Sequence, residues 1–198
     1  MTDHYFTNSP QSEENRKNIS FRFLALEETF VSDDGVFSKN TLDYGSRVLL
    51  ETLLKQSVGG RVLDLGCGIG CIGILLKKSF PAISLTMSDI NERAVALAKE
   101  NSARYHQDNR VVVSDGFAYL TDEFDMVVTN PPIRTGKKVI YELFHQAHDH
   151  LAATGKLVLV MRRDQGAESA IRYLNTLFSE VKVLEKAKGY WVICASRR

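Results

Sequence analysis

Short apolar runs alternate with amphipathic stretches along most of the chain, and this pattern predicts its secondary structure. The apolar runs expected to form strands are Arg61–Leu65, Ile83–Met87, Arg110–Val113, Phe124–Thr129 and Lys156–Met161. The stretches with apolar residues at helical spacing, expected to form helices, are Gly70–Ser79, Asn91–Tyr105, Lys138–Leu151 and Gln165–Phe178. Such alternation predicts an α/β fold, with a mostly parallel sheet and helices on both faces.

The C-terminal end breaks this alternation. Two apolar runs, Val181–Leu184 and Tyr190–Ala195, are separated only by residues 185–189. A crossover between parallel strands needs a dozen or more residues, so these two strands are expected to pair as an antiparallel hairpin. We therefore predict a seven-stranded sheet whose last strand is antiparallel, which argues against an ordinary nicotinamide-binding domain.

The first part of the chain has a different pattern. Residues 1–19 are polar, and we expect a mobile or loosely docked arm there, followed by one domain over residues 20–198. Two runs, Ile19–Leu26 and Glu28–Val31, predict a small N-terminal β element. Thr41–Gln56 has the apolar spacing of one further helix.

The composition fits one globular domain, because 44% hydrophobic content over 198 residues is enough for a full-sized core. No apolar run approaches the roughly 20 residues of a membrane span, and the N-terminus lacks a signal-peptide pattern. We therefore expect a soluble cytoplasmic protein without a membrane partner. The net charge of +1 means that any contact with nucleic acid must be a local patch.

The three cysteines predict neither disulfides nor nucleophilic catalysis. Cys67, Cys71 and Cys194 form no C-x-x-C pair, and their odd number argues against a disulfide framework. Nothing beside Cys67 or Cys71 resembles the partner residues of a thiol nucleophile. We expect small, buried, reduced thiols.

A glycine-rich loop follows the predicted strand Arg61–Leu65. Glycine occupies every second position from Gly66 to Gly70, which permits positive φ and lets a ligand lie against bare backbone beside a helix N-terminus. Gly68–Gly73 also fits the dinucleotide pattern G-x-G-x-x-G, with Asp89 at the spacing of a ribose-binding acid. The loop alone therefore leaves a nicotinamide cofactor and S-adenosylmethionine both open. Asp64 favours the second, because its carboxylate would repel a pyrophosphate and attract a cationic sulfonium.

Acids also follow two neighbouring strands, where ligands of such sheets bind. Asp89 can accept both ribose hydroxyls, although it could instead serve a helix cap. Asp115 can accept from an adenine amino group while Ile90 or Phe117 packs the ring, although Asp115-Gly116 could equally be a plain turn.

The segment Asn130-Pro131-Pro132-Ile133 follows the strand Phe124–Thr129. Two prolines fix φ twice and remove two N–H groups, which leaves a stiff turn with free carbonyls. The Asn130 side-chain oxygen and the Pro131 carbonyl can together accept both hydrogens of an exocyclic amino group. A rigid bend without chemistry is the alternative.

Several of these motifs together resemble a known family. Asp64–Gly70 resembles the first motif of Rossmann-like S-adenosylmethionine methyltransferases, and Asn130–Ile133 looks like the catalytic turn of enzymes that methylate amino groups. Aliphatic Ile133, together with Gly35–Ser38 and Leu42–Ser46, makes the chain similar to the small-domain family of ribosomal RNA guanine-N2 methyltransferases over roughly residues 20–196. Members can carry a second, related N-terminal domain, whereas this chain is expected to hold only the catalytic one.

The resemblance implies a Rossmann-like methyltransferase fold, S-adenosylmethionine as cofactor and small-subunit ribosomal RNA, free or in the subunit, as partner. It implies a catalytic role for Asn130, Pro131, Pro132 and Ile133. The residues expected at the cofactor are Phe37, Asp64, Gly66, Cys67, Gly68, Gly70, Asp89, Ile90, Asp115, Gly116, Phe117 and Asn130.

A paired amino group cannot reach such a site, so the base must be single-stranded or flipped out. The cations expected to hold its phosphates are Arg134, Lys137, Lys138, Arg162 and Arg163, although each could be ordinary solvated surface. We expect no metal, because His145, His148 and His150 lack a cysteine partner and only the first two share a helical face. We expect a monomer or weak homodimer.

Three alternatives remain open from the residues. The substrate amino group could belong to a protein glutamine or an adenine rather than to guanine. The chain could be a non-catalytic RNA assembly factor that binds S-adenosylmethionine. It could also be a nicotinamide oxidoreductase.

Overall fold

The computed structural model describes residues 15–36 and 40–198. Residues 1–14 of the predicted arm, and Phe37, lie outside the described residues. The first strand, β1 (Lys17–Phe23), pairs antiparallel with β2 (Leu26–Ser32). The small β element is therefore confirmed, and it begins at Lys17, within the last three residues of the predicted arm.

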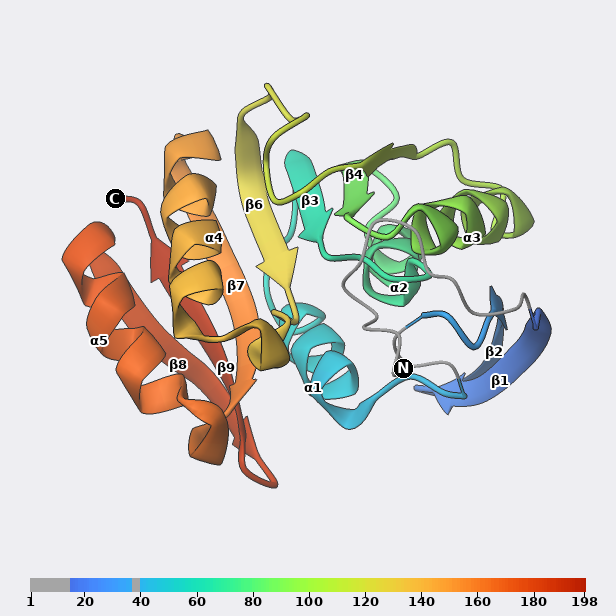
Figure 1. Ribbon diagram of the computed structural model, residues 1–198, viewed down its shortest axis with the longest axis horizontal. Coiled ribbons are helices and arrows are strands. Elements are labelled where there is room, and N and C mark those ends of the chain that lie inside the picture. Colours follow the sequence, from blue (N-terminus) through green and yellow to red (C-terminus); the bar gives the residue numbers. More distant parts are fainter. Residues whose placement is uncertain (1–14, 37–39) are drawn as a thin grey trace.

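Seven strands form one sheet in the order β5-β4-β3-β6-β7-β9-β8 (Figure 1). Their bounds are β3 Arg61–Leu65, β4 Ser84–Asp89, β5 Arg110–Val113, β6 Phe124–Thr129, β7 Leu151–Arg162, β8 Glu180–Ala187 and β9 Tyr190–Ser196. Strands β3 to β7 pair in parallel, and β9 is antiparallel to both of its neighbours, β7 and β8. The predicted Rossmann-like methyltransferase fold is confirmed. The antiparallel strand β9 lies inside the sheet, and β8 forms its edge.

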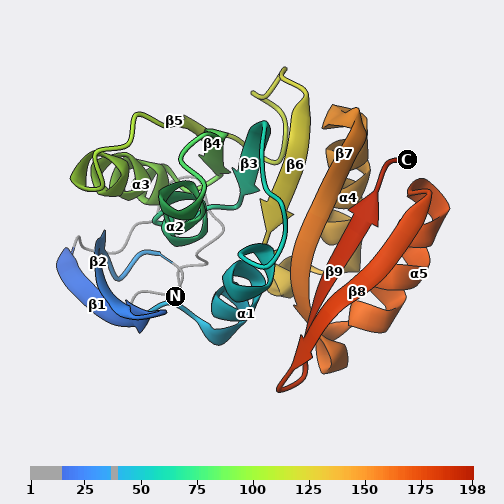
Figure 2. The same cartoon turned by 180° about the vertical axis from the view of Figure 1, so that it is seen from behind.

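In the described chain, helices cover both faces of the sheet. One face carries α1 (Tyr44–Leu53), α2 (Cys71–Ser79) and α3 (Glu92–Arg104), which lie in front in Figure 2. The other carries α4 (Lys137–His150) and α5 (Ala167–Leu177), in front in Figure 1. Successive side chains of a strand point to opposite faces of the sheet. Val62 therefore packs in the core under α1 to α3, and Leu63 and Leu65 pack in the core under α4 and α5.

Local hydrogen bonds explain where elements depart from the predicted bounds. The carboxylate of Asp43 accepts from the backbone N–H of Ser46, so α1 begins at Tyr44 and not at Thr41. The side chain of Asn91 likewise caps α3. Leu151 was predicted in a helix but pairs with Phe124 in the sheet, so β7 is longer than expected.

A buried asparagine joins the N-terminal hairpin to the glycine loop. The Asn101 side chain accepts from the Val31 N–H at 2.7 Å and donates to the Val31 carbonyl at 3.0 Å. It also donates to the carbonyl of Ile69 at 2.9 Å. The hairpin, α3 and the loop after β3 are thereby tied together at one fully buried side chain.

Candidate functional site

A cavity of about 630 Å³ lies at the carboxyl end of the parallel strands. The chain passes from β3 to β4 on one side and returns to β6 on the other. This change of direction opens a crevice beside β3, where sheets of this kind bind ligands. Loops line the cavity in the order of the strands: Ser114–Gly116, Asp89–Asn91, Leu65–Ile69, Thr129–Thr135, Arg162 and Tyr190.

The glycine loop leaves room for a ligand against its backbone. Gly66 and Gly68 have φ of +71° and +54°, and both line the cavity. A Cβ on either would meet nothing within 4 Å, so a side chain there would project into open space. The N–H groups of Gly66 and Cys67 donate to the Ser88 carbonyl, which fixes the loop against the end of β4.

Gly70, by contrast, does not line the cavity. It precedes α2 with φ of +91°, and a Cβ there would lie 2.9 Å from Cδ1 of Ile74. Gly70 is needed for the turn and for helix packing. Its predicted contact with the cofactor stays a prediction.

Asp89 lies in the cavity wall, at the end of β4. Its Oδ2 accepts from the Gly68 N–H at 2.8 Å, and its Oδ1 accepts from the Asn91 N–H at 2.9 Å. Burial raises the pKa of this carboxyl, and these backbone hydrogen bonds counteract part of that shift. Each oxygen keeps a lone pair, so the group can still accept from a ribose diol.

Asp64 lies beneath the cavity rather than in its wall. Because Leu63 and Leu65 face α4 and α5, Asp64 faces α2, where its Oδ2 accepts from the Gly73 N–H at 2.8 Å. Its Oδ1 is buried without a hydrogen-bond partner in the described structure. Burial raises the pKa of Asp64 to about 7, with a smaller contribution from nearby Asp89. The structure thus places Asp64 below the loop, and its predicted contact with the cofactor stays a prediction.

At the β5 end of the cavity, Ile90, Asp115 and Gly116 line the wall, and their contact with the cofactor stays a prediction. Phe117 does not. Its ring is buried in the core of the α4 face and stacks on His150 at 4.5 Å between ring centroids. Apolar packing therefore takes this ring away from the ligand, and Ile90 is the apolar residue left beside Asp115.

Asn130 is held by the first turn of α1. Its Nδ2 donates to the Asp43 carboxylate at 3.2 Å and to the Ser46 hydroxyl at 3.1 Å. Both amide hydrogens are thus used, which leaves the Asn130 Oδ1 as a free acceptor; nothing in the described chain donates to it or to the Pro131 carbonyl. Two acceptors on a stiff turn are suited to an exocyclic amino group.

Sequence reasoning missed the role of Asp43 and Ser46. Both line the cavity, and the only sequence signal was their place in the segment Leu42–Ser46 before a helix. Their partner lies more than eighty residues away along the chain, so no local pattern links them.

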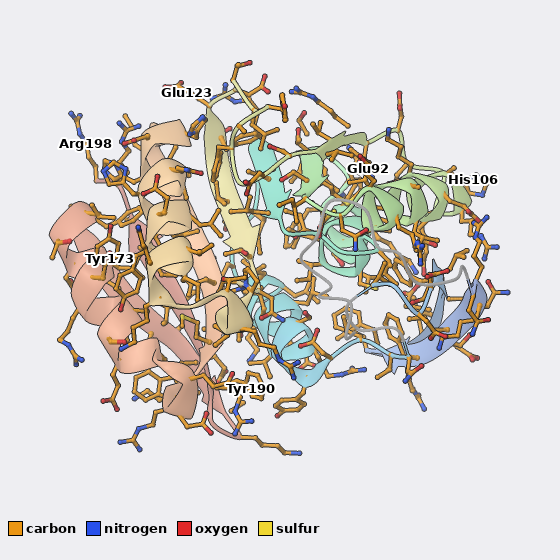
Figure 3. All side chains as sticks on the ribbon, viewed as in Figure 1. Glu92, His106, Glu123, Tyr173, Tyr190 and Arg198 are labelled. Carbon is orange, nitrogen blue, oxygen red and sulfur yellow. The ribbon has the colours of Figure 1, made fainter. Side chains whose placement is uncertain are left out.

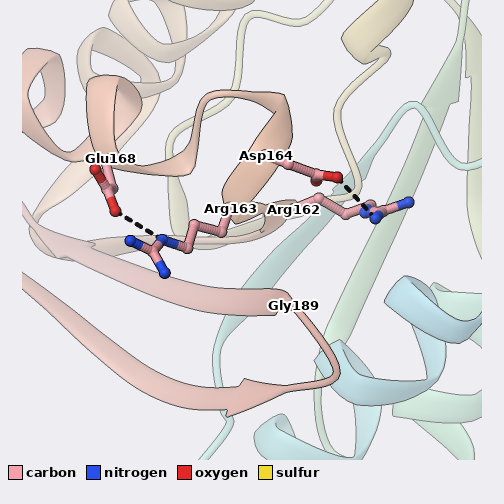
Figure 4. A pocket seen from close by; sticks show the side chains of 5 residues that line it. All are labelled: Arg162, Arg163, Asp164, Glu168 and Gly189. Carbon is pink, nitrogen blue, oxygen red and sulfur yellow. Dashed lines mark hydrogen bonds and ion pairs between the residues drawn. The ribbon is translucent and has the colours of Figure 1, made fainter.

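The predicted phosphate-binding cations divide into two groups. Arg134 and Arg162 line the cavity. Lys137 and Lys138 are exposed at the start of α4, outside the lining, and Arg163 faces a separate outer hollow of about 500 Å³. In that hollow Arg162 pairs with Asp164 at 2.8 Å and Arg163 with Glu168 at 2.9 Å (Figure 4).

Cys67 and Cys71 line the cavity as free thiols. Burial raises the pKa of both thiols, which keeps them protonated and poor nucleophiles. The ring nitrogens of His150 lie within hydrogen-bond distance of the Gln146 and Leu120 carbonyls. Over residues 15–36 and 40–198, no cluster of three metal-ligating side chains is present.

The model of the methyltransferase small domain matches residues 27–194. The chain belongs to this family. Family membership excludes the nicotinamide alternative that the glycine spacing left open. No helix in the described part of the chain is both long and apolar enough to cross a bilayer.

Three similar proteins illustrate the family. The uncharacterized protein YbxB of Bacillus subtilis is 42% identical over 200 residues, covering 100% of both chains. Ribosomal RNA small subunit methyltransferase C of Haemophilus ducreyi is 43% identical over 184 residues, covering 89% of this chain and 54% of the relative.

The third is a solved structure, the T. thermophilus 16S rRNA N2 G1207 methyltransferase (RsmC) in complex with AdoMet and guanosine. It has a TM-score of 0.83 at 27% identity, covering 92% of this chain and 51% of that chain. The chain thus spans about half the length of the two named methyltransferases.

Proposed function

We propose that this protein methylates the exocyclic 2-amino group of a guanine in small-subunit ribosomal RNA. The observation that carries the proposal is Asn130, whose amide hydrogens are both taken by Asp43 and Ser46. Its oxygen and the Pro131 carbonyl are left as a pair of acceptors in the cavity wall. An amino group attached to a ring presents the two hydrogens that such a pair accepts.

The cofactor of this methyltransferase is S-adenosylmethionine. When bound, it supplies an electrophilic methyl group. The residues suited to hold it are those of the open glycine loop, Gly66 to Gly68, with Asp89 for the ribose and Ile90 and Asp115 for the adenine. These residues fit S-adenosylmethionine for two reasons. The backbone of Gly66 and Gly68 is open to a ligand, and the neighbouring Asp89 carboxylate retains lone pairs that can accept from the ribose.

Asn130 and Pro131 act on the amino nitrogen. A guanine 2-amino group is a poor nucleophile, because its lone pair is delocalised into the ring. Acceptance of both hydrogens favours a pyramidal nitrogen, and the same two oxygens stabilise the positive charge that develops on it. The extra proton then leaves to water or a nearby acceptor, so no strong base is required.

The nature of the relatives supports RNA as the substrate. Named homologues at about 40% identity act on small-subunit ribosomal RNA, and a structural relative holds guanosine. We infer that Arg134, Lys137, Lys138, Arg162 and Arg163 contact phosphates around a flipped-out base. We expect a protein with such a substrate to be cytoplasmic. The monomeric or weakly dimeric state stays a prediction.

The variant Asn130→Ala tests the proposal. We expect it still to bind S-adenosylmethionine in calorimetry, and to lose methyl transfer to unmodified small subunits by about 100-fold or more. Asn175→Ala is the matched control, because Asn175 bonds only the Ile171 carbonyl on the surface of α5. Full activity of Asn130→Ala, or wild-type labelling of protein glutamine or adenine instead of guanine, would contradict the proposal.

A further inference from the structure

The cavity contains one aromatic side chain among the described residues that line it, and this is Tyr190. The catalytic turn ends in aliphatic Ile133, so it supplies no ring. A nucleobase that leaves its stack is usually received on an aromatic ring or a guanidinium plane. Tyr190 is therefore the natural partner for the face of such a base.

The antiparallel strand β9 brings Tyr190 to the cavity. Tyr190 is the first residue of β9 and pairs with Arg162, the last residue of β7. Because β9 runs against the parallel strands, its beginning meets their carboxyl ends. Figure 3 shows Tyr190 near α1, where the β8–β9 hairpin turns. The strand order and direction thus place Tyr190, like Asn130, at the carboxyl ends of the parallel strands.

The Tyr190 ring is seated on the first turn of α1. Its centroid lies 5.5 Å from that of Tyr44, with 60° between the planes. A Cβ on Gly45 would lie only 2.9 Å from Cε1 of Tyr190, so the absence of a side chain at Gly45 lets the ring approach. This turn also carries Asp43 and Ser46, which hold Asn130. One turn of helix therefore positions both the ring and the acceptor.

Arg162 lies next to Tyr190 in the lining of the cavity. Its guanidinium carbon lies 5.7 Å from the Tyr190 centroid, and its Nη2 donates to Asp164 at 2.8 Å. Its buried Nε has no hydrogen-bond partner in the described chain. Arg162 lines the cavity and also the outer hollow, which Figure 4 shows. The Arg162 guanidinium therefore lies between the cavity and the outer hollow that contains Arg163.

We propose that Tyr190, flanked by Arg162, is the stacking wall that receives the ring of the target base while its amino group meets Asn130. The inference rests on the proposed function in requiring a nucleobase as substrate. Stacking holds a base equally before and during methyl transfer. Tyr190 therefore acts mainly on KM for RNA, whereas Asn130 acts on kcat.

The test compares Tyr190→Leu and Tyr190→Phe with unmethylated small subunits as substrate. We expect Tyr190→Leu to raise KM for RNA by roughly 5- to 100-fold, as loss of one base–aromatic stack does. Tyr190→Phe keeps the ring and should stay within about twofold of wild type. Both variants should bind S-adenosylmethionine normally in calorimetry, which also shows that they are folded.

In Gly45→Ala the added Cβ would lie 2.9 Å from Cε1 of Tyr190 and 3.2 Å from Oδ1 of Asp43, so it displaces the ring without removing it. We expect a raised KM there as well. An unchanged kcat shows that Asp43 still holds Asn130. Tyr119→Leu is the matched control, since Tyr119 is 70% exposed and outside the cavity lining. An unchanged KM in both Tyr190→Leu and Gly45→Ala, while wild type methylates guanine, would overturn the stacking wall alone. Methylation of protein by wild type would overturn the wall and the proposed function together.

Discussion

Asp64 illustrates how a residue can be noticed in the sequence for one reason and serve another. The predicted role was attraction of a sulfonium, but the alternation of β3 turns the side chain toward α2 and away from the cavity wall. Its carboxylate instead holds the Gly73 N–H at the start of α2. The residue supports the loop through the helix that follows it.

The raised pKa of Asp64, about 7 against an ordinary 3.8, makes stability depend on pH. Between about pH 4 and 7 the folded chain keeps a proton that the unfolded chain has lost. Stability is therefore greatest below this window and decreases through it, by at most about 1.4 kcal/mol per pH unit. Asp64→Asn removes this titration. As pH rises from 4.5 to 8, the free energy of unfolding of wild type should therefore decrease relative to that of Asp64→Asn.

Urea unfolding at the two pH values measures this difference. Asp122→Asn is the matched control, because Asp122 is a half-exposed acid paired with Arg110 at the surface. A gap between Asp64→Asn and wild type that is the same at pH 4.5 and 8 would show that Asp64 titrates in its ordinary range.

Among the elements, the N-terminal hairpin contributes to the site without touching it. Asn101 on α3 bonds both backbone groups of Val31 in β2 and the Ile69 carbonyl in the glycine loop. The hairpin is thus coupled to the glycine loop through one side chain.

Asn101→Ala leaves these backbone groups buried without partners. We expect a loss of stability of about 1–3 kcal/mol, and weaker binding of S-adenosylmethionine because the loop is less fixed. Thermal unfolding and calorimetry measure the two effects. Asn175→Ala, which breaks an exposed bond within one helix, should change neither. Wild-type stability of Asn101→Ala would show that the hairpin is not coupled in this way.

Strands, helices and the loop at the cavity were predictable because each depends on local patterns of apolar residues, glycine and proline. Asp89 and the Asn130 turn were predictable because parallel strands end at one edge. Phe117 was not, because its distance from Asp115 in sequence does not reveal that its ring turns into the core. Asp43 and Tyr190 reach the cavity only through tertiary packing of α1 and the antiparallel β9.

At the scale of the whole molecule, charge is nearly balanced, so the proposed binding of RNA requires local clusters of basic side chains. Arg162 and Arg163 are each neutralised by an acid in the outer hollow. In the described chain no acid pairs with Arg134, Lys137 or Lys138, which follow the turn Asn130–Ile133. This second group is the stronger candidate for phosphates. The single-domain boundary at residue 20 and the polar arm stay predictions.

The double variant Lys137→Gln/Lys138→Gln should weaken RNA binding and lower the salt dependence of its affinity. Each lost contact to a single strand reduces the slope of log K against log salt by about 0.7. Filter binding between about 50 and 200 mM salt measures this slope. Lys55→Gln/Lys182→Gln removes two exposed lysines that are paired with acids. An equal loss of slope in both double variants would contradict a local patch.

The most direct test of the central claim is the methylation state of small-subunit ribosomal RNA in cells with and without this protein. Nucleoside mass spectrometry after site mapping should show one N2-methylguanine that disappears with the gene. Wild type should restore it, and Asn130→Ala should not. An unchanged set of RNA methyl groups, together with loss of a methylglutamine from a protein, would contradict the assignment.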